Sequence, residues 1–240
     1  MKIVVSAWMR DEQERRKDLW RRLWAGQPVE RIPLQIQVLA PTRYTVREQF
    51  QDGDKQLEVA LASALATWEL APSSDAIPAM RPDVGCSCLA SAFGAQYYWG
   101  DSDAQTPGIQ EPVITDLERQ VDDLRVPDPT KDGWLPEGLR RIRLFAEAGE
   151  GFIPVSLLDA AGGLNVVADL MGMTETLTAL YTAPEAMHRL LDKVQDLYTA
   201  TICAGIAAAG GQENITTVDF PDLWFPEGMK GHVSDDLSAN

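Results

Sequence analysis

The sequence is poor in cysteine, in histidine and in positive charge. It has 3 cysteines and 2 histidines among 240 residues. Three cysteines cannot all pair within one chain, and so few of them are typical of a reducing compartment in which thiols stay free. Lys and Arg total 21 against 36 Asp and Glu, which gives a formal net charge of -15. This charge repels nucleic acid and acidic membrane surfaces, so we expect neither as a partner.

Long apolar runs are lacking as well. The run Ile3–Val5 is too short for the apolar region of a signal peptide, and no small-residue cleavage site follows it. No segment is long enough to span a membrane. We therefore predict a cytoplasmic protein. With 45% hydrophobic residues the chain can still bury a sizeable core, and we expect a single domain over residues 1–240.

Helical patterns alternate with short apolar runs along the chain. Residues 11–25 carry Leu19, Trp20, Leu23 and Trp24 at helical spacing before Gly26, which predicts an amphipathic N-terminal helix. Further helices are expected at residues 54–71, 137–148, 164–171 and 184–210, and strands at 32–39, 75–80, 152–158, 214–220 and 231–234. Strands separated by helices of this length favour parallel βαβ units.

The predicted fold class is therefore α/β, of the (β/α)8 TIM-barrel type. Such a barrel has eight strands and typically about 250 residues. Only the first four to five strands are recognisable here, so we expect an incomplete barrel. A complete doubly wound α/β domain with a short edge strand is the alternative.

Several sequence runs resemble the uroporphyrinogen decarboxylase superfamily. They are Asp75–Gly85, Ala92–Ala95, Val126–Pro129, Leu170–Gly172, Tyr181–His188 and Gly231–Asp236. Each run is weakly specific, and their order and spacing over residues 12–240 carry the resemblance. The superfamily contains cofactor-free decarboxylases of uroporphyrinogen and zinc-dependent methyltransferases that use methylated corrinoids. Both place their ligands at the C-terminal mouth of a barrel.

The resemblance implies a decarboxylase-like enzyme acting on a tetrapyrrole or a related polycarboxylate, without a cofactor. In that chemistry, arginines hold the carboxylates and an acidic residue stabilises the protonated pyrrole. By the matching positions, Asp75 is the expected catalytic residue, and the substrate is expected to contact Arg43, Tyr44, Arg47 and Arg81. The pattern is only partly kept. The first arginine of the decarboxylase motif has no clear counterpart, and no phenol stands near Ala168, where the decarboxylases carry a substrate-binding tyrosine.

Acidic residues follow or end several predicted strands. Asp159, Asp219, Asp235 and Asp236 would meet at the mouth of a barrel. Shared carboxylates at a mouth raise some of their pKa values and permit acid or base work. Capping of the following helix or turn is an equal alternative for Asp159 and Asp236. We include Asp159, Asp235 and Asp236 among the expected substrate-binding residues.

Two other functions stay open. A methyltransferase of the same superfamily would need zinc and a corrinoid, and its His-x-Cys and later Cys ligands would fall beyond residue 240. No metal ligand is predicted within the chain, because Cys86 and Cys88 are interpreted as small packed residues and His232 lacks a ligand partner at Ser234. A non-catalytic barrel that binds a tetrapyrrole or corrinoid is the third reading. The expected partner is a small molecule, with a corrinoid protein and a homodimer as further alternatives.

Overall fold

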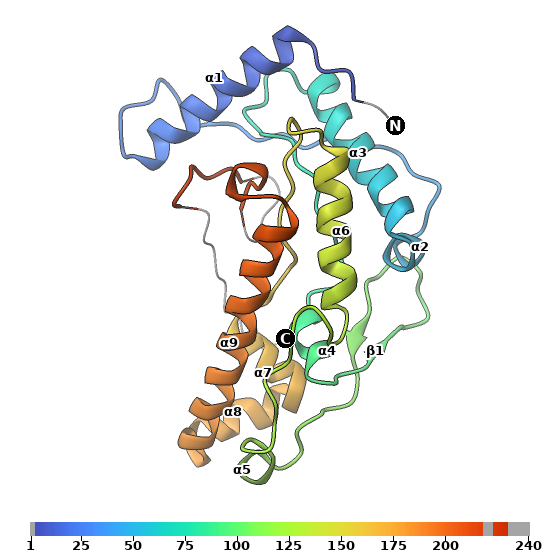
Figure 1. Ribbon diagram of the computed structural model, residues 1–240, viewed down its shortest axis with the longest axis vertical. Coiled ribbons are helices and arrows are strands. Elements are labelled where there is room, and N and C mark those ends of the chain that lie inside the picture. The colour runs from blue at the N-terminus through green and yellow to red at the C-terminus, as the bar shows by residue number, and fades with distance from the viewer. Residues whose placement is uncertain (1–2, 218–222, 230–240) are drawn as a thin grey trace. The chain divides into compact units, whose positions relative to one another are not determined.

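The computed structural model describes residues 3–217 and 223–229. The chain divides into two compact units, both traced in Figure 1. The first comprises the described parts of Met1–Pro82, Arg140–Leu158 and Gly205–His232. The second comprises Asp83–Leu139 and Asp159–Ala204. Each unit is built from segments that are far apart in the sequence.

Three helices open the first unit: α1 (Ala7–Trp24), α2 (Val46–Gln51) and α3 (Gly53–Leu70). The start of α1 lies before the predicted residue 11, because the Ser6 side chain accepts a hydrogen bond from the N–H of Met9 and caps the helix there. Its end agrees with the prediction, since Gly26 adopts a φ of +66° just after it. The helix predicted at 54–71 is α3.

Two further helices, α6 (Leu135–Ala148) and α9 (Pro184–Ala208), match predicted ones. Arg141 is buried in the part of α6 that belongs to the first unit. It donates hydrogen bonds to the carbonyl of Phe50 at 2.6 Å and to Oε1 of Gln56 at 3.3 Å. These contacts join α6 to α2 and α3, which lie beside it in Figure 1. A 3₁₀ turn, η1 (Gln212–Asn214), follows α9.

Segments predicted as strands lie side by side in the first unit. The N–H of Asp75 donates to the carbonyl of Leu34, Met80 is bridged in parallel to Val155, and Val155 to Ile215. The pairing consists of isolated bridges, so the prediction of regular strands in these segments was wrong. The reason is local, because Pro33, Pro78 and Pro154 have no N–H to donate to a ladder. The expected strand at 231–234 lies outside the described residues.

Side chains satisfy the backbone of the segment predicted as the first strand. Every second N–H along it donates to a side-chain oxygen at 2.8 to 3.0 Å. The donors are Leu34, Ile36, Val38 and Ala40, and the acceptors are Asp75, Ser74, Thr67 and Ser63. The N–H groups therefore donate at every second residue, as they would in a strand. Their acceptors, however, are side-chain hydroxyls and a carboxylate, and not the backbone carbonyls of a neighbouring strand.

The second unit holds α4 (Cys88–Ala92), α5 (Leu117–Gln120), α7 (Gly163–Met171) and α8 (Met173–Thr182). The only regular strands in the described residues form a short antiparallel hairpin, β1 (Tyr97–Tyr98) with β2 (Gly108–Ile109). The fold is thus a mostly helical α/β fold. No helix in the described part of the chain is long and apolar enough to cross a membrane.

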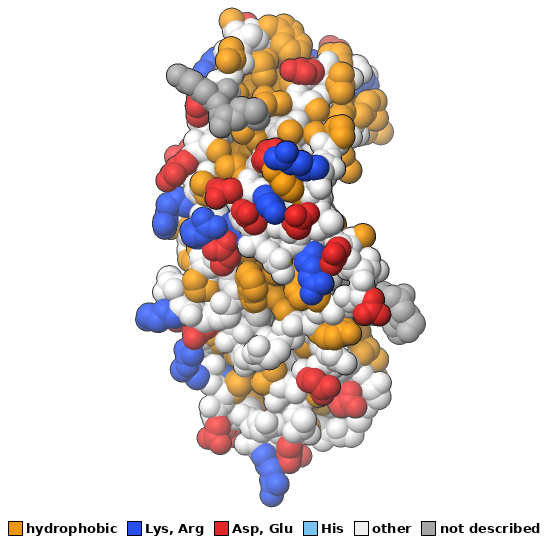
Figure 2. Space-filling view, turned by 90° about the vertical axis from the view of Figure 1, so that its right-hand side faces the viewer, with side chains coloured by type: hydrophobic (Ala, Val, Ile, Leu, Met, Phe, Trp, Pro, Cys, Tyr) orange, Lys and Arg blue, Asp and Glu red, His pale blue; other side chains and the backbone are white. Residues whose placement is uncertain are grey.

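Basic and acidic side chains are mixed on the surface. On the face drawn in Figure 2, Lys and Arg side chains lie among Asp and Glu side chains. The protein also has ion pairs between neighbours in the sequence, such as Arg15 with Glu12 and Lys131 with Asp128. Exposed pairs of this kind contribute little to stability, and on this face they leave no separate basic patch.

Candidate functional site

Asp75, the expected catalytic residue, is fully buried at the amino end of its segment. Nη2 of Arg31 donates to Oδ1 of Asp75 at 2.8 Å, Nη1 of Arg31 donates to Oδ2, and the N–H of Leu34 donates to Oδ2 at 2.8 Å. Burial alone would raise the pKa of Asp75, but the hydrogen bonds from Arg31 and Leu34 outweigh it and hold the pKa below its ordinary value. The carboxylate is therefore ionised and already saturated with donors.

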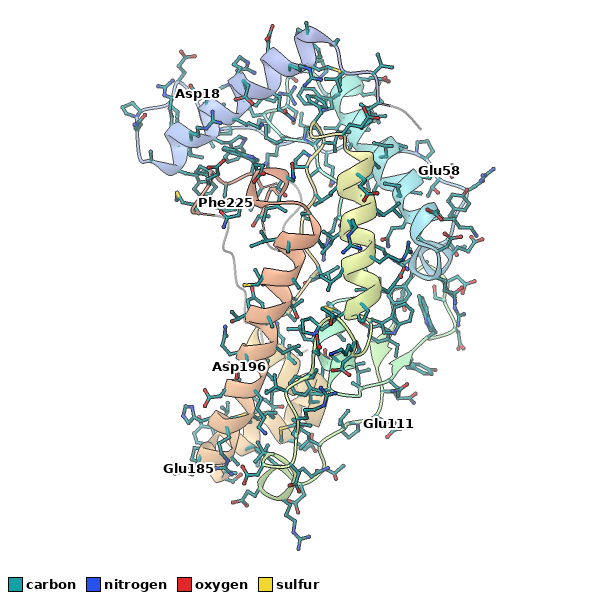
Figure 3. All side chains as sticks on the ribbon, in the orientation of Figure 1. Asp18, Glu58, Glu111, Glu185, Asp196 and Phe225 are labelled. Atoms are coloured by element: carbon teal, nitrogen blue, oxygen red, sulfur yellow. The ribbon has the colours of Figure 1, made fainter. Side chains whose placement is uncertain are left out.

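Arg43 and Tyr44 lie on the surface of the first unit. Nη2 of Arg43 donates to the Tyr44 hydroxyl at 2.8 Å, and that hydroxyl donates to Oε2 of Glu58 at 2.9 Å. Glu58 is on α3, as labelled in Figure 3. Arg47 is half-buried within α2. Arg43 and Tyr44 are therefore engaged with one another and with α3.

Arg81 and Asp159 come directly after the segments that end at Met80 and Leu158, and each is half-buried. Both residues interact with other groups of the protein. Asp219, Asp235 and Asp236 lie outside the described residues. Of the expected substrate-binding acids, Asp159 is thus the one whose surroundings are defined.

A group of thiols and carboxylates surrounds Asp159 in the second unit, and we call it the Asp169 group. It comprises Cys86, Ser87, Cys88, Asp159 and Asp169. Ser87 is bridged antiparallel to Ala160, and Sγ of the buried Cys88 donates to the carbonyl of Asp159 at 3.4 Å. The Ser87 side chain hydrogen-bonds the half-buried carboxyl of Asp169 on α7.

Burial and negative charge shift Asp169, Cys86 and Cys88 toward their protonated forms. Burial raises the pKa of Asp169, and the hydrogen bond with Ser87 only partly opposes the shift. Partial burial, followed by the charges of Asp159 and Asp169, raises the pKa of Cys86. Burial and the Asp159 charge likewise raise the pKa of Cys88 far above its ordinary value. All these shifts favour neutral acids over anions.

The arrangement suits proton donation and not thiolate chemistry. A reactive thiolate needs positive surroundings that lower its pKa, whereas carboxylates lie beside Cys86 and Cys88. A carboxyl whose pKa is raised, by contrast, keeps its proton to a higher pH than an ordinary carboxyl, as a general acid must. Among the described residues, Asp169 is the member of the group best placed for this role.

Zinc does not fit the described residues. Within 3–217 and 223–229, no three His, Cys, Asp or Glu side chains are grouped so that they could hold a metal ion. Protein zinc sites use at least three such ligands.

Sequence reasoning missed Asp169. Its signal was present, because Asp169 is the only charged residue in the sequence of α7, GLNVVADLM, and it lies between the buried Val166, Val167 and Leu170. A lone carboxyl on an apolar helix is costly unless it is paired or protonated. The expected packing of Cys86 and Cys88 was half right, since Cys88 is buried and Cys86 is exposed.

Comparison with known proteins places these features in context. A model of uroporphyrinogen decarboxylase (URO-D) matches residues 15–216. A solved structure of a methyltransferase from Methanosarcina mazei is similar, with a TM-score of 0.56 and 20% sequence identity over 79% of this chain and 56% of that chain. The present chain thus spans little more than half the length of that structure, and at this identity the likeness shows the fold alone. Curated proteins gave no match.

Proposed function

Because the chain belongs to the uroporphyrinogen decarboxylase family, we propose that the Asp169 group is where it acts on a small molecule, by proton donation from Asp169. The family match confirms the resemblance that the sequence predicted, and membership of this family supports an enzymatic role. We further propose that the bridged segments at 75–80, 153–158 and 214–217, with the segment at 32–39 beside the first of them, take the places of the first strands of a barrel, although they form no regular strands. Asp159 would then stand at the catalytic mouth.

Methyl transfer is the reaction that the local charge supports best. Burial is the largest cause that raises the pKa values of Cys86, Cys88 and Tyr97, and at each of them the negative charge of Asp159 or Asp83 adds to it. Negative surroundings of this kind disfavour a polycarboxylate and favour a neutral or cationic methylated substrate.

The proposed step transfers a methyl group away from a heteroatom. The bond between the methyl carbon and the heteroatom breaks, and its electron pair stays on the heteroatom. The carboxyl of Asp169 donates its proton to that atom, while the methyl carbon is taken up by an external nucleophile, a role that corrinoids fill in the superfamily's methyltransferases. The acid is effective because it lowers the barrier to departure of a poor leaving group.

Decarboxylation is the second candidate. The same carboxyl could protonate the carbon left behind by the loss of carbon dioxide. Arg81 favours this reading, because it follows Met80 at the carboxyl end of its segment and only one residue separates it from Asp83 in the sequence. A substrate carboxylate there would pair with a guanidinium, as in other sites that recognise carboxylates.

One pair of assays separates the candidates. The chain is incubated with cob(I)alamin and a panel of methylated amines and aryl methyl ethers, and methylcobalamin is followed by its absorbance. In parallel, uroporphyrinogen is supplied and carbon dioxide release is measured. We expect methylcobalamin formation, reduced roughly 10²-fold or more in Asp169→Asn.

Carbon dioxide release without methyl transfer would contradict the first candidate and support the second. Binding of cobalamin or porphyrin without either product would instead make the chain a non-catalytic binder. The matched control is Asp122→Asn, because Asp122 is an exposed carboxylate of the same unit that pairs with Arg189 at 2.9 Å. Its activity should equal that of the unaltered chain.

A further inference from the structure

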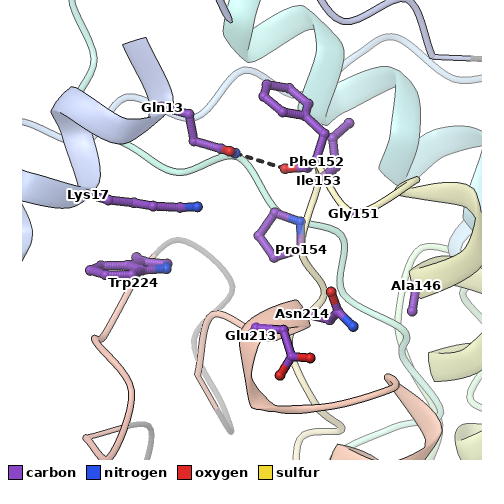
Figure 4. Close-up of a pocket in the computed structure, with 10 residues that line it drawn as sticks. All are labelled: Gln13, Lys17, Ala146, Gly151, Phe152, Ile153, Pro154, Glu213, Asn214 and Trp224. Carbon is purple, nitrogen blue, oxygen red and sulfur yellow. Dashed lines mark hydrogen bonds between the residues drawn. The ribbon is translucent and has the colours of Figure 1, made fainter. Parts of the chain in front are cut away.

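The first unit has a small pocket and an open backbone edge. Figure 4 shows the pocket, which is lined by α1, the chain at 151–154 and η1. Nε2 of Gln13 donates to the carbonyl of Phe152 at 2.8 Å and holds two of its walls together. The space that remains holds only about two or three water molecules. The pocket is therefore too small for a ligand, whereas the edge is open to a macromolecular partner.

The open edge belongs to residues 32–40, which we call the edge segment. In Figure 1 this segment lies between α1 and α2, and it is hydrogen-bonded to α3. Leu34, Ile36 and Val38 each use both their N–H and their carbonyl on one side of the segment. Their partners there are Asp75, Ser74 and Thr67. This side is therefore closed to a further strand.

The opposite side of the edge segment is open. In an extended chain the N–H and C=O groups of successive residues point to opposite sides, so those of Gln37 and Leu39 point away from the engaged side. Both residues are exposed, and neither makes a hydrogen bond to any residue that the structure describes. Free N–H and C=O groups along an edge are a template for the addition of another strand.

The side chains of the edge segment are apolar and exposed. Ile32 is 83% exposed, Leu34 54% and Leu39 75%. Their burial against a partner would be favourable. No ionisable side chain lies between Arg31 and Arg43. A strand that pairs with the edge segment therefore has to be apolar and uncharged as well.

The edge segment itself meets these requirements. When two copies are paired antiparallel about Val38, Gln37 of each copy lies opposite Leu39 of the other. The two residues of such a pair exchange both N–H···O=C bonds, so all the free groups of Gln37 and Leu39 are satisfied. Ile36 then lies opposite Ala40, and Val38 opposite Val38, which gives apolar cross-strand pairs. The net charge of -15 on each copy places no like charges opposite one another along the paired strands.

We propose that the edge segment is the interface of a symmetric dimer, in which two copies of this chain pair their 32–40 segments antiparallel. The interface is two-fold, so the pairing uses the open side of both copies and leaves none for a third. The product is therefore a closed dimer and not a filament. None of these residues belongs to the Asp169 group, and the inference is independent of the proposed function.

The oligomeric state and the amide exchange of the edge segment test this proposal. Sedimentation velocity over a series of chain concentrations should show an equilibrium between monomer and dimer. Hydrogen exchange, followed by mass spectrometry, should slow at the N–H groups of Gln37 and Leu39 as the chain concentration rises. A chain that stays monomeric up to its solubility limit would overturn the proposal, as would a dimer in which exchange at Gln37 and Leu39 does not change.

A proline at the edge tests the backbone pairing. Gln37→Pro removes one free N–H from each copy, so each dimer loses two hydrogen bonds, and the Kd of the dimer should rise roughly tenfold or more. Gln37→Ala is the matched control, because it shortens the same side chain but keeps the N–H. It should dimerise as the unaltered chain does. Equal dimerisation of the two variants would overturn the proposal.

A second variant keeps the proposal falsifiable if Gln37→Pro does not fold, as judged by circular dichroism. Leu39→Lys places a charge on the open edge, and an edge lysine opposes strand pairing. Leu39 is exposed in the single chain, so the fold should be kept while the dimer dissociates. Tyr181→Lys is its control, because Tyr181 is 89% exposed and lies on α8 of the second unit. A dimer of unchanged Kd in Leu39→Lys would contradict the proposed interface.

Discussion

The guanidinium of Arg31 forms a two-pronged ion pair with the carboxylate of Asp75, with Nη2 and Oδ1 2.8 Å apart. The Asp75 side chain is 0% exposed and that of Arg31 is 50% exposed. The same carboxylate accepts the N–H of Leu34, and the indole of Trp20 donates to the Asp75 carbonyl at 2.8 Å. The Asp75 residue therefore joins three parts of the first unit. Its carboxylate holds Arg31 and Leu34, and its carbonyl holds Trp20 of α1.

Asp75→Asn should destabilise the first unit. The amide cannot accept from Arg31 and Leu34 as a carboxylate does, so a buried donor loses its partner, at a cost of about 1–3 kcal/mol. Urea unfolding measures the difference. Glu58→Gln is the control, because Glu58 is an exposed acceptor of the Tyr44 hydroxyl, and its effect should be below about 0.5 kcal/mol. Loss of activity without loss of stability would instead mark Asp75 as the catalytic residue.

The stability of the chain should depend on pH through Asp75 in a defined direction. Its pKa in the folded chain lies below the ordinary value. Its contribution is therefore present above the unfolded pKa, about 3.9, and is lost as the pH falls through the folded value. In Asp75→Asn this acid-induced loss should be smaller. An identical acid transition in both chains would contradict the ion pair.

Asp169 should show the opposite dependence. Burial raises its folded pKa, so its contribution is full below the unfolded pKa and is lost as the pH rises through the folded value. Asp169→Asn removes this penalty and should unfold at a higher urea concentration near neutral pH. A variant that is less stable than the parent at that pH would contradict this prediction, because it would mean that the folded chain stabilises the ionised carboxylate.

Cys86 should react slowly with iodoacetamide at neutral pH, because partial burial and the charge of Asp159 raise its pKa. Asp159→Asn should speed the reaction, since one of the negative charges is lost. Mass spectrometry of the peptides gives each rate, with the exposed Cys203 as the internal reference. An unchanged ratio of the two rates would argue against electrostatic coupling between Asp159 and Cys86.

Gly133→Ala should destabilise the second unit more than Gly26→Ala destabilises the first. Both glycines have a positive φ, +59° and +66°. A Cβ on Gly133 would lie 2.5 Å from the backbone nitrogen of Ala92, whereas one on Gly26 meets nothing within 4 Å. Both substitutions carry the same conformational cost of a positive φ, about 1 kcal/mol. The difference between their effects on the unfolding free energy therefore measures the cost of bringing the new Cβ at residue 133 against Ser91 and Ala92. Equal effects would mean that the loop at 133 relaxes.

The helices could be predicted from the sequence because their signals are local. Leu19, Trp20, Leu23 and Trp24 repeat at helical spacing, and Pro184 begins α9 as expected. The segments predicted as strands at 75–80 and 152–158 form only isolated bridges, since Pro78 and Pro154 interrupt pairing with residues distant in sequence, and the hairpin of β1 and β2 was not predicted. The Asp169 group depends on Ser87, Asp159 and α7 meeting in space, which no local pattern encodes.

The pH profile of methylcobalamin formation, compared between the parent chain and Asp169→Asn, tests the central claim most directly. An acid must be protonated to donate, so the parent rate should fall as the pH rises through the raised pKa of Asp169. In Asp169→Asn the rate should be low and should lose this descending limb. The same descending limb in both chains, at similar rates, would contradict a role for Asp169 as the acid.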